Sequence, residues 1–412
     1  MSTPHPDKLS IIIVNDFAHI NGGAALVALE SAKALAQLGH DVTLFAAVEP
    51  IDEELEKSGV QVICTVQYEI LTDPDRMRAV RQGLWNNYSK SKFEKLLQQK
   101  DRSSTIVHLH GWTKSLSSSV IRAAIDNSFP IVCTLHDYFT ACPNGGFFDY
   151  QKNEICTRQA LSLDCLLTNC DKQGYAQKLY RTLRQRKQKN KGKTPGGIRH
   201  FINISEFSLN ILKPYLPSNA SVHFVPNPIF IDKTEPAQPD KNDRFICVGR
   251  LSPEKGLHHL AQAVLSANAK LTVVGDGELR NELEQKHPEI EFTGWLDREQ
   301  VIKQIQASRA LILPSLWYET QGLVVAEAAA LGVPSIVPDS CAARDMVTDR
   351  NTGLWFKGGD IDDLAGKVVS LGDNSKAQSM GRAAYDKFWA APPTMDAHLA
   401  TLLTVYSRIL NT

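Results

Sequence analysis

Short apolar runs alternate with helical patterns along most of the chain. In the first half, runs rich in valine and isoleucine predict strands at residues 9–15, 41–47, 105–110, 131–136 and 221–225. A Gly-Gly turn follows the first strand, and residues 24–38 then have the spacing of a helix that ends at Gly39. Strands that are apolar on both faces and separated by helices form parallel sheets with helices on both sides.

The same alternation of strand and helix patterns occurs in the second half, with strands predicted at residues 244–248, 270–274, 309–313 and 335–338. Residues 226–243 between the two series are rich in proline and polar residues, which indicates a linker. The fold class is therefore α/β, with two Rossmann-like doubly wound domains. We expect a first domain at 1–228 with an insertion at 139–200, a second domain at 240–390, and a terminal helix at 391–412 that packs back on the first domain. Residues 60–104 also interrupt the alternation of strands and helices, and we expect them to be an insertion within the first domain.

The charge balance, the number of cysteines and the lack of long apolar segments exclude several classes of protein. The 412 residues include 45 basic and 45 acidic side chains, so the formal net charge is zero. That balance argues against a protein whose whole surface binds nucleic acid. Eight cysteines are too few for a disulfide scaffold, and neither an apolar signal segment nor a membrane span is evident. These features predict a cytoplasmic protein.

One candidate phosphate site follows the strand at 244–248. The segment G-R-L-S-P-E-K-G places Arg250 and Lys255 on one turn where a helix is about to begin. Two fixed cations beside a helix N-terminus suit a diphosphate whose charge grows as it leaves. The alternative is a solvated basic turn. Other nucleotide fingerprints are absent: no G-x-x-x-x-G-K-[ST] occurs, and the first strand leads into Asn21-Gly22-Gly23-Ala24 instead of G-x-G-x-x-G.

A second candidate site follows the strand at 309–313. Glu319 falls in the loop, and Glu327 falls inside an otherwise apolar helix. A carboxylate on such a helix is costly unless it accepts hydrogen bonds, and vicinal sugar hydroxyls are natural donors. Gly322 leaves backbone N–H groups free at the helix start. A structural pair between Glu327 and a core cation is the alternative.

Together these motifs resemble the signature of the retaining glycosyltransferases of family 4, which have the GT-B fold. The segments GRLSPEKG, VVGDG, FTGWL, LPSLWYE, EAAALGVP and NTGLWF occur in the family's order. The resemblance implies a sugar-nucleotide donor, with UDP or GDP as its nucleotide, held by the second domain, and an acceptor held by the first. Arg250 and Lys255 would neutralise the diphosphate, Glu319 would contact the sugar hydroxyls, and Glu327 would hold the ribose.

The resemblance also assigns further contacts. Backbone groups at Gly322 and Leu323 would meet the sugar or phosphate, and Gly275 and Trp295 would border the nucleotide. Gly22 and Gly23 would let the first domain's backbone approach the phosphates. His136 matches the position that faces the transferred sugar, whereas Asp137 beside it is interpreted as structural.

The mechanism implied is retention by same-face substitution, without a protein nucleophile and without a catalytic metal. The acceptor would be a glycan or a lipid-linked saccharide of the cell surface. Two alternatives stay open: a nucleotide-sugar epimerase of related fold, and a catalytically inactive membrane-associated binding protein. His108 and His110 share one strand face, where lining of the acceptor cleft is favoured over a metal site.

Four cysteines lie close together in the insertion: Cys142, Cys156, Cys165 and Cys170. None forms the tight C-x2-C pair, so structural zinc, free thiols and disulfides all stay open.

Residues 172–199 hold ten basic residues and no acidic one. Such a run is usually a solvated face, but it also suits docking on anionic lipid headgroups, on the inner face of the plasma membrane. Nucleic acid is the less favoured anion.

Overall fold

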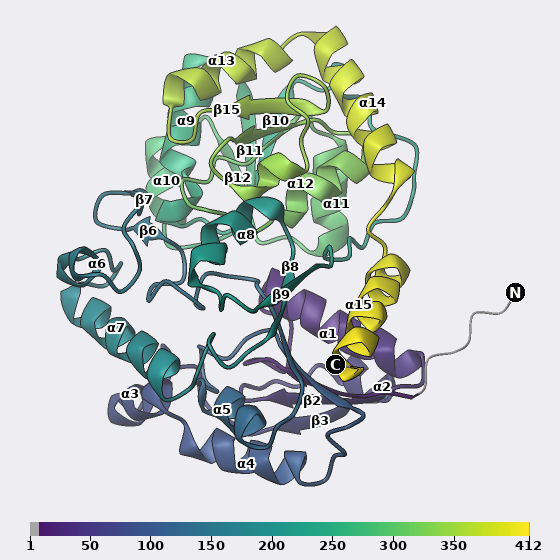
Figure 1. Cartoon of the computed structure of the whole chain (residues 1–412). Helices are drawn as coiled ribbons and strands as arrows, with labels where there is room; N and C mark the ends of the chain where they lie inside the picture. Colours follow the sequence, from purple (N-terminus) through teal and green to yellow (C-terminus); the bar gives the residue numbers. More distant parts are fainter. Residues whose placement is uncertain (1–7, 412) are drawn as a thin grey trace, which may run out of the picture.

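The computed structural model describes residues 8–411 and contains two parallel sheets, each with helices on both faces (Figure 1). The first is seven-stranded, in the order β3-β2-β1-β4-β5-β8-β9. Its strands are β1 (Ser10–Val14), β2 (Asp41–Ala46), β3 (Gln61–Cys64), β4 (Thr105–Leu109), β5 (Ile131–Thr134), β8 (His200–Asn203) and β9 (Ser221–Phe224).

The second sheet is six-stranded, in the order β12-β11-β10-β13-β14-β15. Its strands are β10 (Arg244–Val248), β11 (Lys270–Val274), β12 (Glu291–Gly294), β13 (Leu311–Ile312), β14 (Ser335–Pro338) and β15 (Gly353–Phe356). The prediction of two doubly wound α/β layers is confirmed.

Four strands of these two sheets were not predicted from the sequence: β3, β8, β12 and β15. Residues 60–104 are not simply an insertion, because β3 pairs in parallel with β2 and forms the edge of the first sheet. The strand β3 begins with an exposed glutamine, and β12 also begins with an exposed glutamate. Because edge strands are solvated on one side, they lack the continuous apolar run that marks a central parallel strand.

Helices cover both faces of each sheet. In the first layer these are α1 (Gly23–Gln37), α2 (Glu53–Lys57), α3 (Arg76–Leu84), α4 (Asn87–Leu97), α5 (Ser119–Asp126) and α8 (Glu206–Leu212). In the second they are α9 (Leu257–Ser266), α10 (Arg280–Lys286), α11 (Arg298–Gln306), α12 (Leu323–Ala330), α13 (Ile361–Leu371) and α14 (Asn374–Ala390). Within residues 8–411, no helix combines the length and the apolar character needed to cross a bilayer.

The last helix, α15 (Met395–Leu410), leaves the second layer and packs beside α1 against the first sheet (Figure 1). Its apolar face carries Leu399, Leu402, Val405 and Tyr406, which belong to the same buried cluster as Ile11 and Ile13 of β1. Burial of each such side chain contributes about 1.5–3 kcal/mol. The end of the chain therefore helps to hold the first sheet.

The region at 139–200 contains a small hairpin of β6 (Phe148–Asp149) and β7 (Glu154–Ile155), followed by α6 (Leu163–Leu167) and α7 (Tyr175–Asn190). The basic run is a helix with internal contacts, not merely a solvated face. Arg181 pairs with buried Asp171, and Arg184 donates to the carbonyls of Thr113 and Pro143. Burial lowers the pKa of Arg184 to about 10.

The proposal of a structural zinc site at Cys142, Cys156, Cys165 and Cys170 is not supported. All eight cysteines are free thiols, and no group of three or more metal-binding side chains gathers anywhere in residues 8–411. The Nζ of Lys178, a fully buried side chain, lies 3.1 Å from Cys170 Sγ and 3.5 Å from Cys165 Sγ. An amine that reaches the sulfurs takes the place that a metal ion would need.

Candidate functional site

Loops that follow the strands of the two sheets meet between the two layers. Thr320 Oγ1 donates to the carbonyl oxygen of His136, at 2.9 Å, across this boundary. The side chains of Asn227 and Gln321 share a hydrogen bond beside it. A methyl group placed on Gly23 would lie 3.2 Å from Leu323, so the Gly-Gly turn before α1 faces the start of α12. Predicted residues of both halves thus come together at one boundary.

The G-R-L-S-P-E-K-G segment forms a tight turn between β10 and α9. Gly256 has φ +70°, and a Cβ there would lie 2.1 Å from the carbonyl oxygen of Pro314. Only glycine fits both the left-handed backbone and this close approach. The turn presents Arg250, whose guanidinium is mostly exposed and lies 3.4 Å from the buried carboxylate of Glu254.

Lys255 and Glu319 form a largely buried ion pair that joins the loops after β10 and β13. The Glu319 carboxylate also accepts a hydrogen bond from Ser315 Oγ, at 2.7 Å. Burial alone would raise the pKa of Glu319, but the Lys255 charge and the hydrogen bonds from Lys255 and Ser315 hold it below its usual value. The Lys255 ammonium also lies 5.4 Å from the centre of the Trp317 ring.

Glu327 lies on α12 and is paired with Arg298, with Oε1 and Nη2 separated by 3.2 Å. The side chains of Glu327 and Arg298 are 18% and 43% exposed, so the pair meets solvent and is not part of the core. Burial raises the pKa of Glu327, while the charge of Arg298 opposes that rise. Gly322, with φ +85°, precedes the helix and leaves its first N–H groups without intrahelical partners.

The remaining predicted glycines and Trp295 have distinct environments. A Cβ on Gly275 would lie 2.0 Å from the carbonyl oxygen of Gly249, so the loops after β10 and β11 pass in backbone contact. Gly22 has open space around it, and Trp295 is 77% exposed in the loop after β12. An indole this exposed leaves one ring face available to a ligand.

His136 and His110 lie next to each other below Thr320. Their ring nitrogens, Nε2 of His136 and Nδ1 of His110, are 2.9 Å apart. Burial lowers the pKa of His136 to about 3, with a smaller contribution from His398, so the imidazole is neutral. Burial raises the pKa of Asp137 to about 6, and its carboxylate accepts from the backbone N–H of Phe139, at 2.8 Å. That contact fits the structural role expected for Asp137.

Several residues of the site were not predicted. Ser315, Glu254 and Arg298 each contact a predicted side chain, and Thr320 donates to the backbone carbonyl of His136. Ser315 and Glu254 lie inside the two motifs, and this closeness in the sequence is the one signal that could have identified them as partners of the predicted residues. Arg298 comes from another element, α11, and only the fold brings it to Glu327.

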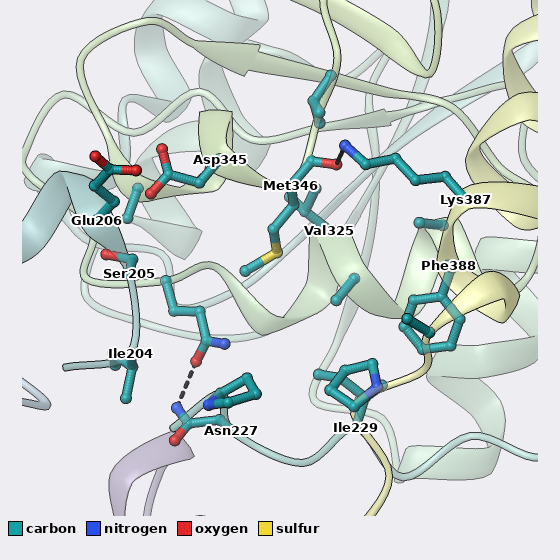
Figure 2. A pocket seen from close by; sticks show the side chains of 18 of the residues that line it. Ile204, Ser205, Glu206, Asn227, Ile229, Val325, Asp345, Met346, Lys387 and Phe388 are labelled. Carbon is teal, nitrogen blue, oxygen red and sulfur yellow. Dashed lines mark hydrogen bonds between the residues drawn. The ribbon is translucent and has the colours of Figure 1, made fainter. Parts of the chain in front are cut away.

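A cavity of about 790 Å³ lies between the two layers, against α12, and Asn227 and Gln321 of the boundary are among its lining residues (Figure 2). Val325 and Ile229 form part of its apolar wall, Glu206 and Asp345 lie together at one end, and Phe388 closes another side. Its lining includes neither of the paired carboxylates, Glu319 and Glu327, nor the two cations of the G-R-L-S-P-E-K-G turn. The Lys255–Glu319 and Glu327–Arg298 pairs therefore lie outside this cavity.

Comparison with known proteins gives matches over most of the chain. Residues 21–233 match the model of Glycosyltransferase Family 4, and residues 229–387 match that of Glycosyl transferases group 1. A GDP-mannose-dependent alpha-mannosyltransferase of Mycobacterium tuberculosis is 36% identical over 115 residues, which cover 28% of this chain and 30% of the relative. A glycogen synthase of the same species is 30% identical over 177 residues, which cover 40% of this chain and 41% of the relative. Each match thus spans less than half of the relative's length.

Among solved structures, HepE of Anabaena in complex with UDP superposes with a TM-score of 0.67 at 16% identity, covering 97% of this chain and 100% of that chain. A sucrose-phosphate synthase of Thermosynechococcus elongatus gives a TM-score of 0.68 at 17% identity, over 98% of this chain and 100% of the other. These likenesses establish the fold, two Rossmann-like domains in the GT-B arrangement.

Proposed function

This chain belongs to glycosyltransferase family 4, and we propose that it transfers a hexose, with retention, from a nucleoside-diphosphate sugar to a hydroxyl of a glycan or lipid-linked acceptor. The buried Lys255–Glu319 pair carries this proposal. It holds a cation and a carboxylate side by side at the boundary where the second domain faces His136. A cation stabilises a leaving diphosphate, and a carboxylate accepts hydrogen bonds from the hydroxyls of a sugar.

In this proposal the two cations act on the leaving group. Lys255 is fixed by Glu319, whereas Arg250 is mostly exposed and would exchange its 3.4 Å contact with Glu254 for a bound diphosphate. Their charge stabilises the diphosphate more as its bond to the sugar breaks, which lowers the barrier. UDP in the HepE complex and the GDP-mannose dependence of the mycobacterial relative support a nucleoside-diphosphate donor, with the base left open between uracil and guanine.

The carboxylates hold hydroxyl groups. Glu319 is ion-paired and bonded to Ser315, so it is suited to accept hydrogen bonds from the sugar and poorly suited to attack carbon. Glu327 would exchange Arg298 for the ribose hydroxyls, and the free N–H groups at Gly322 and Leu323 would meet the sugar or phosphate. Gly275 and Trp295 would border the nucleotide, with Gly22 and Gly23 against its phosphates.

The acceptor would approach from the first domain, beside His136. Without a protein nucleophile, the acceptor hydroxyl attacks from the face that the diphosphate leaves, and a phosphate oxygen takes its proton. The chain's part in this step is to position both reactants and to stabilise the separated charge.

We further propose that the protein docks on the cytoplasmic face of an anionic membrane. Along α7, Tyr175, Leu179 and Leu183 recur every four residues and are 40%, 44% and 56% exposed. Leu163 and Leu167 of α6 are 72% and 69% exposed, and the Tyr175 hydroxyl bonds the neighbouring helix at Leu166. Exposed cations follow on the same segment at positions 186, 189 and 193. An apolar stripe with adjacent cations is typical of helices that lie in a lipid interface.

Donor binding is the first test. Thermal unfolding would be measured with UDP-, GDP- and ADP-sugars, and one base is expected to stabilise the fold. Release of nucleoside diphosphate should then require an acceptor, screened among simple glycosides and polyprenyl-diphosphate sugars. Conversion of the donor without any acceptor would instead indicate an epimerase, and binding without turnover would indicate an inactive protein.

Membrane docking is tested by sedimentation with vesicles of phosphatidylcholine, with and without phosphatidylglycerol. Binding is expected only to the anionic vesicles, and it should fall in a Leu179→Ser/Leu183→Ser double variant. The matched control is Leu265→Ser on α9 of the other domain, also an exposed leucine, at 43%. Equal binding of all three proteins would exclude docking by α7.

A further inference from the structure

A second cavity, of about 380 Å³, lies within the first domain, where α3 and α7 pack side by side (Figure 1). The Tyr180 hydroxyl of α7 donates to the carbonyl oxygen of Val80 on α3, at 3.4 Å, and a Cβ on Gly83 would lie 2.1 Å from the same hydroxyl. Phe139, three residues after His136, completes the wall. Among the residues that the structure describes, none of those assigned to the donor lines this cavity.

The lining of this cavity combines apolar walls with positive charge. Its apolar side chains are Ile70, Leu71, Val80, Phe139 and Ala176. Its cations are Arg76, Lys114, Arg181 and Arg184, and no acidic residue of the described chain lines it. Lys114 is paired with Glu69, at 3.2 Å, outside the lining. Arg181 is paired in the same way with Asp171, at 2.8 Å. Such a lining suits a ligand that has both an anionic group and a hydrocarbon chain.

Two of these cations, Arg184 and Arg76, have carbonyl groups as partners instead of carboxylates. Arg184, whose guanidinium is partly buried, donates to the carbonyl oxygens of Thr113 and Pro143, at 3.2 and 3.3 Å. Arg76 donates to the carbonyl oxygen of Ile70, at 2.8 Å. Neither arginine forms an ion pair within residues 8–411. Carbonyl groups orient a guanidinium but do not neutralise it, so an anionic ligand is the partner that both cations lack.

The cavity adjoins the loop that carries His136. The backbone N–H of Phe139, a lining residue, donates to the carboxylate of Asp137, which directly follows His136. Burial raises the pKa of Asp137, and the charges of Lys114 and Arg184 lower it. The cations of the cavity are thus close enough to act on this loop. An anion held by them would lie beside the loop where the acceptor is expected.

Exposed apolar side chains continue from the cavity along both helices. Ala176 of α7 lines the cavity and is exposed, and Leu179 and Leu183 follow it by three and seven positions, on the same side of the helix. These two leucines are 44% and 56% exposed. On α3, Val80 lines the cavity and is 41% exposed, and Met77, one turn earlier, is 69% exposed. A hydrocarbon chain whose anionic end lies in the cavity can leave along these side chains.

We propose that this cavity binds the diphosphate and the first units of the hydrocarbon chain of a lipid-linked acceptor, a saccharide carried on a polyprenyl diphosphate. This inference rests on the proposed function, and it names the acceptor class. The cations hold the diphosphate, which places the attached sugar beside His136, while the chain runs along α7 to the membrane. A free glycan has neither the diphosphate nor the chain, and would leave both the charge and the apolar wall unmatched.

The experiment measures binding of farnesyl diphosphate, a soluble polyprenyl diphosphate, by titration calorimetry without any donor. Farnesol, inorganic diphosphate and dihexanoyl phosphatidylglycerol are the comparison ligands. Each lacks the diphosphate or the polyprenyl chain, so each should bind at least about 10-fold more weakly. Arg184→Gln should lower the affinity for farnesyl diphosphate by at least about 10-fold, because glutamine still donates to the carbonyl groups but carries no charge.

Two further variants of α7 make the test independent of the partly buried Arg184. Ala176→Glu places a carboxylate at the exposed edge of the cavity and should also lower the affinity at least about 10-fold. Arg186→Gln, an exposed position outside the lining, is the matched control and should keep the wild-type affinity. The proposed donor site could also hold a diphosphate, so Lys255→Met is titrated as well and should bind like the wild type.

Four results would overturn the inference: no binding of farnesyl diphosphate, equal affinity for any comparison ligand, wild-type affinity in Ala176→Glu, or loss of binding in Lys255→Met. With a polyprenyl-diphosphate sugar as acceptor, Ala176→Glu should raise the acceptor KM about 10-fold and leave the donor KM unchanged. Transfer to a simple glycoside without binding of farnesyl diphosphate would overturn the inference and leave the proposed function standing. Binding of farnesyl diphosphate in this cavity without any transferase activity would contradict the proposed function instead.

Discussion

Replacing Lys255 with methionine removes the cation but keeps most of the side-chain volume, and so isolates the ion pair with Glu319. Loss of one partner from a buried pair costs about 3–5 kcal/mol, because the other charge stays buried and unpaired. Glu319 is only 11% exposed, but it keeps its hydrogen bond from Ser315. We therefore expect a loss of stability at the lower end of this range, about 3 kcal/mol. For a domain of this size that loss corresponds to roughly 6–12 °C in Tm.

The assay is thermal unfolding of Lys255→Met, Glu319→Gln and the double variant. Glu319→Gln should cost less, about 1 kcal/mol, because glutamine still accepts from Ser315 and Lys255 can turn toward water. The double variant should be more stable than the sum of the single losses predicts, by at least about 1.5 kcal/mol. Lys367→Met, in a partly exposed pair with Asp363, is the control and should stay within about 0.5 kcal/mol of wild type.

The pH dependence follows from the depressed pKa of Glu319. The stability that its ionised form contributes is present above the unfolded-state value of 4.5 and is lost as the pH falls through the lower folded-state value. Wild type should therefore be more stable than Glu319→Gln at pH 7, and this difference in stability should disappear below about pH 4. A Lys255→Met protein that melts with the wild type, or a gap that widens in acid, would refute a buried ion pair here.

Three further predictions concern single positions. Glu327→Gln should weaken binding of the nucleoside diphosphate about 10-fold in titration calorimetry without lowering Tm, since burial already raises the pKa of Glu327; unchanged affinity would contradict its role at the ribose. Gly256→Ala should cost at least about 2 kcal/mol in denaturant unfolding, whereas Gly366→Ala on α13, with open space around it, should cost nothing; equal stabilities would contradict the left-handed turn. Lys178→Met should fold with unchanged or higher stability and contain no stoichiometric zinc by elemental analysis, because methionine fills the same site without a buried ammonium; stoichiometric zinc would contradict the thiol–amine cluster.

Most central strands, though not β8, and the turns after β10 and β13 could be predicted because apolar runs and glycine spacing are local signals. Gly256, for example, lies in a turn that its own neighbours define, and the structure gives it a left-handed backbone. The edge strands β3 and β12 could not be predicted, since their polar residues are tolerated only where one side meets solvent.

Side-chain partners depended on the fold itself. Nothing near Glu327 in the sequence points to Arg298, which arrives from the preceding helix α11. Spacing of the cysteines was compatible with a metal, but it could not show that Lys178 of the following helix reaches the same sulfurs. Long-range pairs of this kind require the packed structure, because the chain segments that supply them have independent patterns.

Sugar transfer by the Lys255–Glu319 site is tested most directly by donor turnover with and without an acceptor. Nucleoside diphosphate release would be followed for wild type, Lys255→Ala and Lys367→Ala, with the donor found by thermal shift, and the anomeric configuration of the product would be read by NMR. Release that needs the acceptor, retains the donor's configuration, and is lost in Lys255→Ala but kept in Lys367→Ala is the expected result. Inverted product, or turnover of Lys255→Ala at the wild-type rate, would contradict it.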